Sequence, residues 1–489
     1  MNPNKSQKPT KSEFKELSIY TALLPVFALI LMLFYNVFFV FGDDALSGSN
    51  QFILILGAAV AAIVGFINKT SYQKMLEEVS QNLKSTSGAL LILLMVGALS
   101  GTWLVSGIIP TMIYYGLQLL NPTFFLVASV LICAIISIAT GSSWTTSATV
   151  GIALMGIGDT LGISLGMTAG AVLSGSYFGD KMSPLSDTTN LAPAMAGAEL
   201  FDHIKYMAIT TVPTFVITLF LFLIIGFNIE INGTPDISNK LEAIDQAFNI
   251  SPWLLLVPIM VVVLIVKKTP PLVALLTGTL LAALASILAQ PQILMSIAES
   301  ETFNFETAYK GVMQSITVDT AVETSSIELN DLFSAGGMKG MMDTIWLIIC
   351  AMVFGGVMDA IGALSKISKV LLALASSTFG LFASTVASCL ALNVTASDQY
   401  LALVVPGKMF KKAYQDKGLA PENLSRTLED SGTVTSVLVP WNTCGAYQSS
   451  VLGVHVADYF IYAFFNWISP FMTLLVAGLS LKIKQLKTV

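Results

Sequence analysis

The sequence predicts an all-α polytopic membrane protein built from two inverted-topology repeats. Three observations support this. Of its 489 residues, 54% are hydrophobic and only 11% are charged, with a mean hydropathy of +0.77, whereas soluble domains carry about 25% charged residues. Apolar runs long enough to cross a bilayer recur along the chain. Polar interruptions lie at matching positions of the two halves, which is typical of transporters built from inverted repeats.

The repeat is indicated by one offset of 255 residues that aligns three separate places. Each half has a glycine-rich apolar helix, then a short apolar run with a polar interruption, then a second interruption flanked by proline. The matched residues are Ser100-Gly101 with Gly355-Gly356, Ser143 with Asp398, and Ser186-Asp187-Thr188 with Trp441-Asn442-Thr443.

The first repeat is expected over 19–228, after a cytoplasmic tail at 1–18. It contains scaffold helices within 19–110, a re-entrant hairpin at 123–158, a broken helix at 164–202 and a helix at 206–228. An outer linker at 229–250 leads to the second repeat at 251–483. That repeat contains scaffold helices within 251–364 with an outer loop at 290–341, a hairpin at 371–410, a broken helix at 424–452 and a helix at 456–481.

The distribution of basic residues favours this topology. If each hairpin returns to its own side, each half crosses the membrane about five times, and the odd number inverts the second half. Starting from a cytoplasmic N-terminus, only Lys240, Lys310 and Lys339 then fall in outer segments. Because lysine and arginine gather on the cytoplasmic side of membrane proteins, both termini are expected to be cytoplasmic.

The interruptions are the candidate binding site. The stretch 174–197 carries Asp180, Lys181 and Asp187 between apolar runs, and charges are tolerated at membrane depth only where they face protein or water. A helix break exposes carbonyl groups on one side and N–H groups on the other, so the architecture permits binding of a cation, an anion or both. Hydroxyls, carbonyls and carboxylates are the ligands that small hard cations prefer.

The acidic residues distinguish better between a cation and an anion as the ligand. Those in or beside the breaks are Asp180, Asp187, Asp398, Glu429 and Asp430, and Asp359 lies in an apolar run. Removal from water raises the pKa of a carboxyl group, so one site can hold a proton and a cation in turn. Asp187 and Asp398 are the preferred carriers. Asp180 with Lys181 also fits a helix-end ion pair, and Asp359 also fits an interfacial or structural role.

Other features narrow the function. Trp144, Trp441 and Tyr447 would either stack on an organic substrate or simply pack. The four cysteines have no metal-ligand spacing and are interpreted as packing residues. No nucleotide-binding loop or catalytic triad is visible, so the sequence does not indicate an ATP-driven pump or an enzyme, and no cofactor is expected.

Four stretches, GSSWTTSATVGIALMGIG, SGSYFGDKMSPLSDTTNLAPAMAG, NVTASDQYLALVVPGKMF and LEDSGTVTSVLVPWNTCGAY, resemble the NhaC-type sodium/proton antiporter family of the ion transporter superfamily. The resemblance covers nearly the whole chain. It implies a prokaryotic inner-membrane transporter that exchanges Na⁺ for protons. Some members of the family resemble malate/lactate exchangers and others are associated with amino acids, and the motifs do not separate these branches. The resemblance also implies a homodimeric scaffold beside a mobile, elevator-like transport unit.

The resemblance further implies a set of cation-binding residues with serine, threonine, asparagine and aspartate side chains. Carried onto this chain, they are Ser142, Ser143, Asp187, Thr188 and Asn190 in the first half, and Asn393, Thr395, Asp398, Asn442 and Thr443 in the second. Each half keeps one preferred carboxylate, but in a different element, so two equivalent cation sites are not assured. The expected partners are Na⁺, protons and membrane lipid, with no nucleic acid.

Overall fold

The computed structural model describes residues 17–41, 45, 48–119, 121–229, 237–267, 269–330 and 332–486. Residues 1–16 of the expected cytoplasmic tail and 230–236 of the expected outer linker lie outside the described residues. Within the described ranges the chain is almost entirely helical, with one short strand pair, β1 (Thr320–Ala321) and β2 (Ser334–Ala335). Eight described helices are long and apolar enough to cross a membrane, or nine if a bent pair counts as one. The expectation of a polytopic membrane protein is therefore confirmed.

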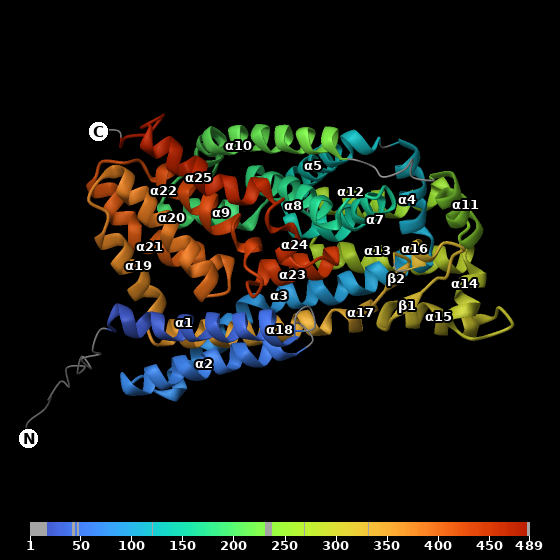
Figure 1. Ribbon diagram of the computed structural model, residues 1–489, viewed down its shortest axis with the longest axis horizontal. Helices are drawn as coiled ribbons and strands as arrows, with labels where there is room; N and C mark the ends of the chain where they lie inside the picture. Colours follow the sequence, from blue (N-terminus) through green and yellow to red (C-terminus); the bar gives the residue numbers. More distant parts are fainter. Residues whose placement is uncertain are drawn as a thin grey trace, which may run out of the picture.

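One group of long helices corresponds to the expected scaffold segments. In this group α3 packs against α18 and α13, and α2 packs against α18 and α1. Figure 1 shows α1, α2 and α18 along the lower edge of the molecule, with α10 along the upper edge. The bounds are α1 (Ile19–Tyr35), α2 (Ser49–Ile67), α3 (Tyr72–Val105), α12 (Leu256–Val266), α13 (Pro271–Ala289), α18 (Met342–Ala360) and α10 (Leu200–Asn228).

Two tips lie where the sequence predicts the hairpins to be interrupted. The first joins α5 (Pro122–Thr140) to a continuous helical stretch made of α6 (Ser143–Thr146), a π turn η3 (Ser147–Gly151) and α7 (Ile152–Thr160). Gly141 ends α5 with φ 69°, a conformation that favours glycine. A Cβ atom there would also lie 2.6 Å from Cβ of Leu185. Glycine therefore lets this tip approach the first helix break.

The second tip joins α20 (Thr378–Thr395) to α21 (Gln399–Asp416), and these two helices pack against each other. The chain reverses direction between the two helices, and Ser397 there has a positive φ of 59°. Asp398 is the N-cap of α21, and its Oδ1 atom accepts hydrogen bonds from the backbone N–H groups of Tyr400 (2.9 Å) and Leu401 (3.0 Å). Such capping satisfies N–H groups that have no partner inside the helix.

Two further interruptions between helices lie within the stretches where the sequence predicts broken helices. In the first, α8 (Leu165–Met182) stops before Pro184 and α9 (Asp187–Ala196) begins after the N-cap Ser186. The second is less regular, with α22 (Pro421–Leu428), a π turn η5 (Glu429–Thr433) and a 3-10 turn η6 (Ser436–Leu438) before Pro440. Its last segment, α23 (Thr443–Leu452), begins after the N-cap Asn442. Proline blocks continuation of a helix because it lacks the N–H donor.

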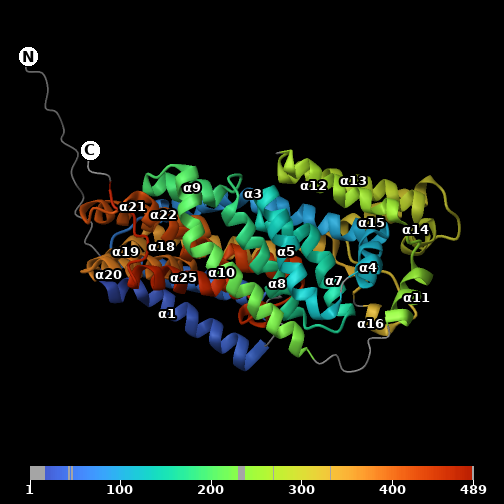
Figure 2. The same ribbon diagram turned by 90° about the horizontal axis from the view of Figure 1, so that it is seen from above.

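The two halves of the chain interlock around these breaks. The first-half α9 packs against the second-half α21 and α22, and α10 packs against α22 and α25 (Phe464–Gly478). Within the first half, α8 lies along α5. Figure 2 shows α5 and α8 between α1 on one side and α12 with α13 on the other. Segments far apart in sequence therefore meet at the centre.

Three segments differ from the sequence expectation in their boundaries. The loop at 290–341 contains four helices, α14 (Pro291–Ile297), α15 (Phe305–Thr317), α16 (Ile327–Asn330) and α17 (Gly337–Gly340). These helices are too short to form apolar runs that are visible in the sequence. The helix expected at 456–481 is divided into α24 (Val456–Phe460) and α25. The helix expected at 206–228 begins earlier, at Leu200, where Glu199 caps α10. The other helices are α4 (Ile108–Leu119), α11 (Ile237–Ala247) and α19 (Ala363–Ala373), with turns η1 (Asn36–Phe41) and η4 (Pro252–Leu255).

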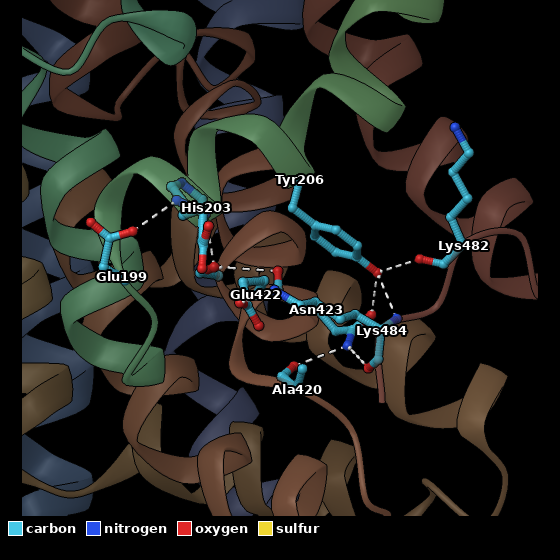
Figure 3. Close-up of polar contacts among 10 residues, drawn as sticks. Glu199, His203, Tyr206, Ala420, Glu422, Asn423, Lys482 and Lys484 are labelled. Carbon is cyan, nitrogen blue, oxygen red and sulfur yellow. Dashed lines mark hydrogen bonds and ion pairs between the residues drawn. The ribbon is translucent and has the colours of Figure 1, made fainter. Parts of the chain in front are cut away.

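The segment after α25 is tied to α22 and α10 (Figure 3). The Tyr206 hydroxyl on α10 lies 2.5 Å from Oδ1 of Asn423 and 2.8 Å from the carbonyl oxygen of Lys482. The Lys484 ammonium donates to Glu422 at 2.5 Å. This hydrogen bond to the Glu422 carboxylate raises the pKa of Lys484 above its ordinary value. The C-terminal segment is thus held against the second broken helix.

Candidate functional site

A cavity of about 540 Å³ lies between the scaffold helices and the tips and breaks. Its scaffold wall comes from α3 and from the link between α12 and α13. The opposite wall contains residues of both hairpin tips and both helix breaks. The polar residues among those that line it are Ser85, Thr86, Thr140, Ser142, Asp180, Ser186, Asp187, Thr188, Thr269, Asp398, Gln399, Tyr400 and Thr443. The cavity therefore joins parts of the chain that the sequence predicts to meet.

In the first half, Asp180 connects the first tip to the first break. Its Oδ2 atom accepts hydrogen bonds from the Ser143 hydroxyl (2.7 Å) and the Ser143 backbone N–H (3.2 Å). Ser142 is the N-cap of α6, and its hydroxyl accepts from the Thr145 N–H at 3.2 Å. Asp180 is not paired with Lys181, its neighbour in sequence, because that lysine contacts Asp430 instead. The alternative of an Asp180–Lys181 ion pair is thus wrong.

Asp187 joins the two halves. It is the first residue of α9, where the helix dipole favours a negative charge. Its Oδ2 atom accepts a hydrogen bond from the Tyr400 hydroxyl at 2.9 Å, a contact between the first break and the second tip. Asp187 is exposed and lines the cavity. Thr188, beside it, lines the same wall and lies 3.2 Å from the Ser186 hydroxyl.

The second tip holds polar oxygens that have no hydrogen-bond partner among the described residues. Asp398 is buried, and while Oδ1 caps α21, Oδ2 has none. The hydroxyls of Thr395 and Ser397, within three residues of Asp398, are likewise buried without a partner. Buried polar atoms in native proteins are nearly always hydrogen-bonded to protein or water, or coordinate an ion. These three oxygens therefore make the second tip a suitable place for a bound cation or ordered water.

Asn393 and Asn442, the two candidate asparagines of the second half, hold this tip in place through hydrogen bonds. Asn442 donates from Nδ2 to the Asn393 carbonyl oxygen at 3.0 Å, and Asn393 donates to the Gly432 carbonyl oxygen at 2.8 Å. The Thr443 backbone N–H donates to the Ser397 carbonyl oxygen at 3.0 Å, and Thr443 lines the cavity. Second break and second tip are thereby held as one unit.

Several sequence candidates lie off the cavity wall. Asn190 is exposed and donates to the carbonyl oxygens of Pro184 and Ser186, so it closes the first break. Trp441 donates to the Val394 carbonyl oxygen at 2.9 Å. Tyr447 stacks on Trp144 with ring centroids 4.0 Å apart, and of this pair only Trp144 lines the cavity. Asp359 lies at the end of α18 and does not line the cavity.

Glu429 and Asp430 are also away from the cavity, in a sealed polar cluster. Asp430 is fully buried and contacts the Lys181 ammonium and the Thr473 hydroxyl. Glu429 is fully buried as well, and neither carboxyl oxygen has a hydrogen-bond partner within the described structure. Three elements, α8, η5 and α25, therefore enclose charged groups in the interior of the protein.

Sequence reasoning missed Tyr400 and Gln399, which line the cavity at the start of α21. Tyr400 follows Asp398 by two residues, so a search around that aspartate for hydroxyl groups would have found it. Ser85 and Thr86 on α3 were missed for another reason. They lie in the scaffold half of the wall, where a helix carries no interruption to mark the site.

Comparisons with known proteins show the class and the family of this protein. The chain falls in the class of antiporters, membrane proteins that exchange one solute for another. A model described as the Na⁺/H⁺ antiporter family matches residues 175–479, and one described as the C4-dicarboxylate anaerobic carrier matches residues 2–227. The Na⁺/H⁺ antiporter NhaC of Alkalihalophilus pseudofirmus is 39% identical over 88% of this chain and 90% of that protein.

The chain belongs to the Na⁺/H⁺ antiporter family. The malate-2H⁺/Na⁺-lactate antiporter of Bacillus subtilis is 36% identical over 86% of this chain and 86% of its own length. The solved structure of Neisseria gonorrhoeae MtrF, whose title describes a class of antimetabolite efflux pumps, aligns over 93% of this chain and 94% of that chain. Its identity is 13% and its TM-score 0.35. The resemblance predicted from the four motifs is confirmed at the level of the family.

Proposed function

We propose that this protein exchanges sodium ions for protons across the membrane, with Asp187 and Asp398 as its principal cation ligands. The observation that carries the assignment is the second tip. There the buried Asp398 Oδ2 atom has no partner in the described chain, and the hydroxyls of Thr395 and Ser397 are likewise free. Asp187 reaches the same cavity from the other half.

The remaining ligands are hydroxyl and carbonyl oxygens on the cavity wall. Ser142, Thr188 and Thr443 line the cavity with the two carboxylates. Ser143 acts through Asp180, and Asn393 and Asn442 hold the tip in shape. Hard oxygen ligands replace the hydration shell of a small cation. A carboxylate that accepts either a proton or Na⁺, but not both, makes occupancy by the two ions mutually exclusive, which is the minimum that exchange requires.

The transport cycle is an alternating-access movement of the tips and breaks against the scaffold. The two tips enter as re-entrant hairpins from opposite sides, and the halves have inverted topology with both termini cytoplasmic in the inner membrane. Matching interruptions in the two halves support this, as they do in other transporters of this kind. Exposed aromatic side chains on α1 and α2, including Phe27 and Phe52, support contact with lipid or with a second copy in a homodimer.

The test is sodium-driven proton movement in proteoliposomes that contain a pH-sensitive dye. Asp187→Asn and Asp398→Asn should each lower the initial rate by about 100-fold or more, because losing an ion–carboxylate contact costs about 3 kcal/mol. Asp359→Asn is the matched control, since Asp359 lies off the cavity wall, and it should retain the wild-type rate. Full activity in both cavity variants would reject the assignment.

A second candidate function is sodium- or proton-coupled exchange of a small organic acid or amino acid. The cavity volume of about 540 Å³ favours it, because pockets for small molecules span roughly 300–1,000 Å³. In that case Trp144, stacked on Tyr447, would form part of the substrate wall, and Trp441 would support the second tip. Uptake of labelled malate, lactate or arginine by the same proteoliposomes separates the two functions.

A further inference from the structure

Beside the Lys181–Asp430 pair, the sealed cluster contains a second acidic side chain, Glu429. Glu429 lies in the π turn η5, where the second broken helix is widened by one residue per turn, and its side chain is fully buried. Neither Oε1 nor Oε2 has a hydrogen-bond partner among the described residues. Single π turns occur frequently at functional sites. An ionised carboxylate buried without donors is strongly unfavourable, so this geometry suits a carboxyl that carries a proton.

The charged groups around Glu429 come from every neighbouring element. Lys181 and Asp180 on α8 both interact electrostatically with Glu429. Lys181 contacts Asp430 rather than Glu429. The helices packed against η5 are α9, α20, α21, α22 and α25. Of these, α20 carries Cys389, which interacts electrostatically with Glu429, α21 carries Tyr414 and α22 carries Arg426. Helix α25 contributes the Thr473 hydroxyl, Asp187 of α9 lines the cavity, and His203 of α10 contacts Ser425 of α22.

Asp180 is the link between this cluster and the cavity. It lines the cavity wall, and its negative charge acts electrostatically on Glu429, so the two carboxyl groups repel each other when both are ionised. A cation bound in the cavity neutralises part of the charge on Asp180. The repulsion on Glu429 then falls, and its proton leaves more easily.

We propose that Glu429 is a proton-carrying carboxyl separate from the cation ligands, and that Na⁺ in the cavity releases its proton by neutralising Asp180. This inference rests on the proposed sodium/proton exchange. In the step, the O–H bond of Glu429 breaks, the proton passes to water, and the carboxylate that remains faces Lys181. Departure of Na⁺ restores the charge on Asp180, and Glu429 takes up a proton again.

A polar row along α22 gives the proton a route to the surface. Glu422, Ser425 and Glu429 lie at intervals of three and four residues, so they share one face of the helix. The Ser425 hydroxyl lies 2.8 Å from Nδ1 of His203 and donates to the Glu422 carbonyl oxygen at 3.3 Å. From Glu422 the contacts continue to Lys484, which is partly exposed and donates to the Glu422 carboxylate; both residues are labelled in Figure 3.

The experiment measures protons released when Na⁺ binds to the purified protein in weakly buffered detergent solution. Glu429→Gln has nearly the shape of the protonated glutamate, so it should fold. It should bind ²²Na⁺ and perform Na⁺/Na⁺ counterflow within about twofold of wild type. The number of protons released for each bound Na⁺ should fall by about half or more, and the pH dependence of Na⁺ affinity should weaken, because only the cavity carboxylates still exchange a proton. Asp359→Asn is the control, because Asp359 lies on α18, outside both the cavity wall and the polar row of α22, and it should keep wild-type proton release.

Two outcomes overturn the assignment of Glu429. One is wild-type proton release from Glu429→Gln. The other is an unshifted midpoint pH of proton release in Glu429→Asp. This variant retains a carboxyl on a shorter side chain, so the midpoint should shift if Glu429 carries the proton. The result decides the role even if the glutamine variant fails to fold. Absence of Na⁺ counterflow in the wild type would instead reject the proposed sodium transport, and this inference with it.

Discussion

The cavity and the sealed cluster use the same kinds of residue in opposite ways. In the cavity, Asp187 is exposed, and Asp398 keeps one oxygen free of any partner in the described chain. In the cluster, Lys181 and Asp430 are fully buried and contact each other, with Thr473 as a third member. Carboxylates with unsatisfied oxygens beside open volume can receive a ligand. Carboxylates already matched by an ammonium group instead hold helices together.

The difference shows that the direction in which a side chain leaves its helix decides its role, even for two residues that are adjacent in the sequence. Asp180 and Lys181 are neighbours, yet successive residues of an α-helix point about 100° apart. One side chain therefore reaches the cavity and Ser143, while the other reaches Asp430 on a different element. A single turn of α8 serves both regions.

The largest effect on stability is expected from breaking the buried pair. Lys181→Met leaves Asp430 buried without its ammonium partner and should destabilise the protein by about 3–5 kcal/mol, because the remaining charge is uncompensated. Thermal unfolding in detergent, monitored by circular dichroism, measures the change.

The matched variant is the double substitution Lys181→Met/Asp430→Leu, which removes both charges. Replacing a whole buried ion pair with apolar side chains is often neutral, so most of the lost stability should return. A double variant no more stable than the single one would show that the cluster does not act as a compensated pair.

A small effect is expected at the partly exposed pair Lys484–Glu422. Lys484→Met should cost about 1 kcal/mol or less, since exposed ion pairs are screened by water. Glu422 raises the pKa of Lys484, so the contribution is complete below the pKa of a free lysine and is lost as pH rises through the raised value. Hydrogen exchange of residues 481–486 should therefore accelerate in the variant, and in the wild type only at strongly alkaline pH.

Lys482→Met provides the comparison for that measurement, because only the backbone carbonyl of Lys482 takes part in the contacts of Figure 3. Its exchange should match that of the wild type. Equal acceleration in both variants would mean that the Lys484 side chain does not hold this segment.

Much of the fold was predictable because interruptions in apolar runs are visible in a single sequence. Pro184 and Pro440 stop helices, and Gly141 and Ser397 mark the tips. The four interruptions do lie at helix ends, as expected. The short helices of 290–341 were not predictable, since segments such as Pro291–Ile297 are too brief for an apolar period to show.

The candidate site was predictable only in part. The sequence places Asp187, Asp398 and Thr443 at interruptions, and these residues do line one cavity. It could not separate Asp180 from Lys181, or show that Glu429 and Asp430 are sealed away, because those distinctions depend on which way a side chain leaves its helix. The inverted topology and the roles of the site residues remain predictions.

The most direct test of the central claim is equilibrium binding of ²²Na⁺ to purified protein by scintillation proximity. We expect saturable binding by the wild type and by the Lys181→Met/Asp430→Leu variant, and loss of binding in Asp187→Asn and Asp398→Asn. Binding that survives in both aspartate variants but disappears when the sealed pair is removed would contradict the account, since it would put the cation in the cluster and not in the cavity.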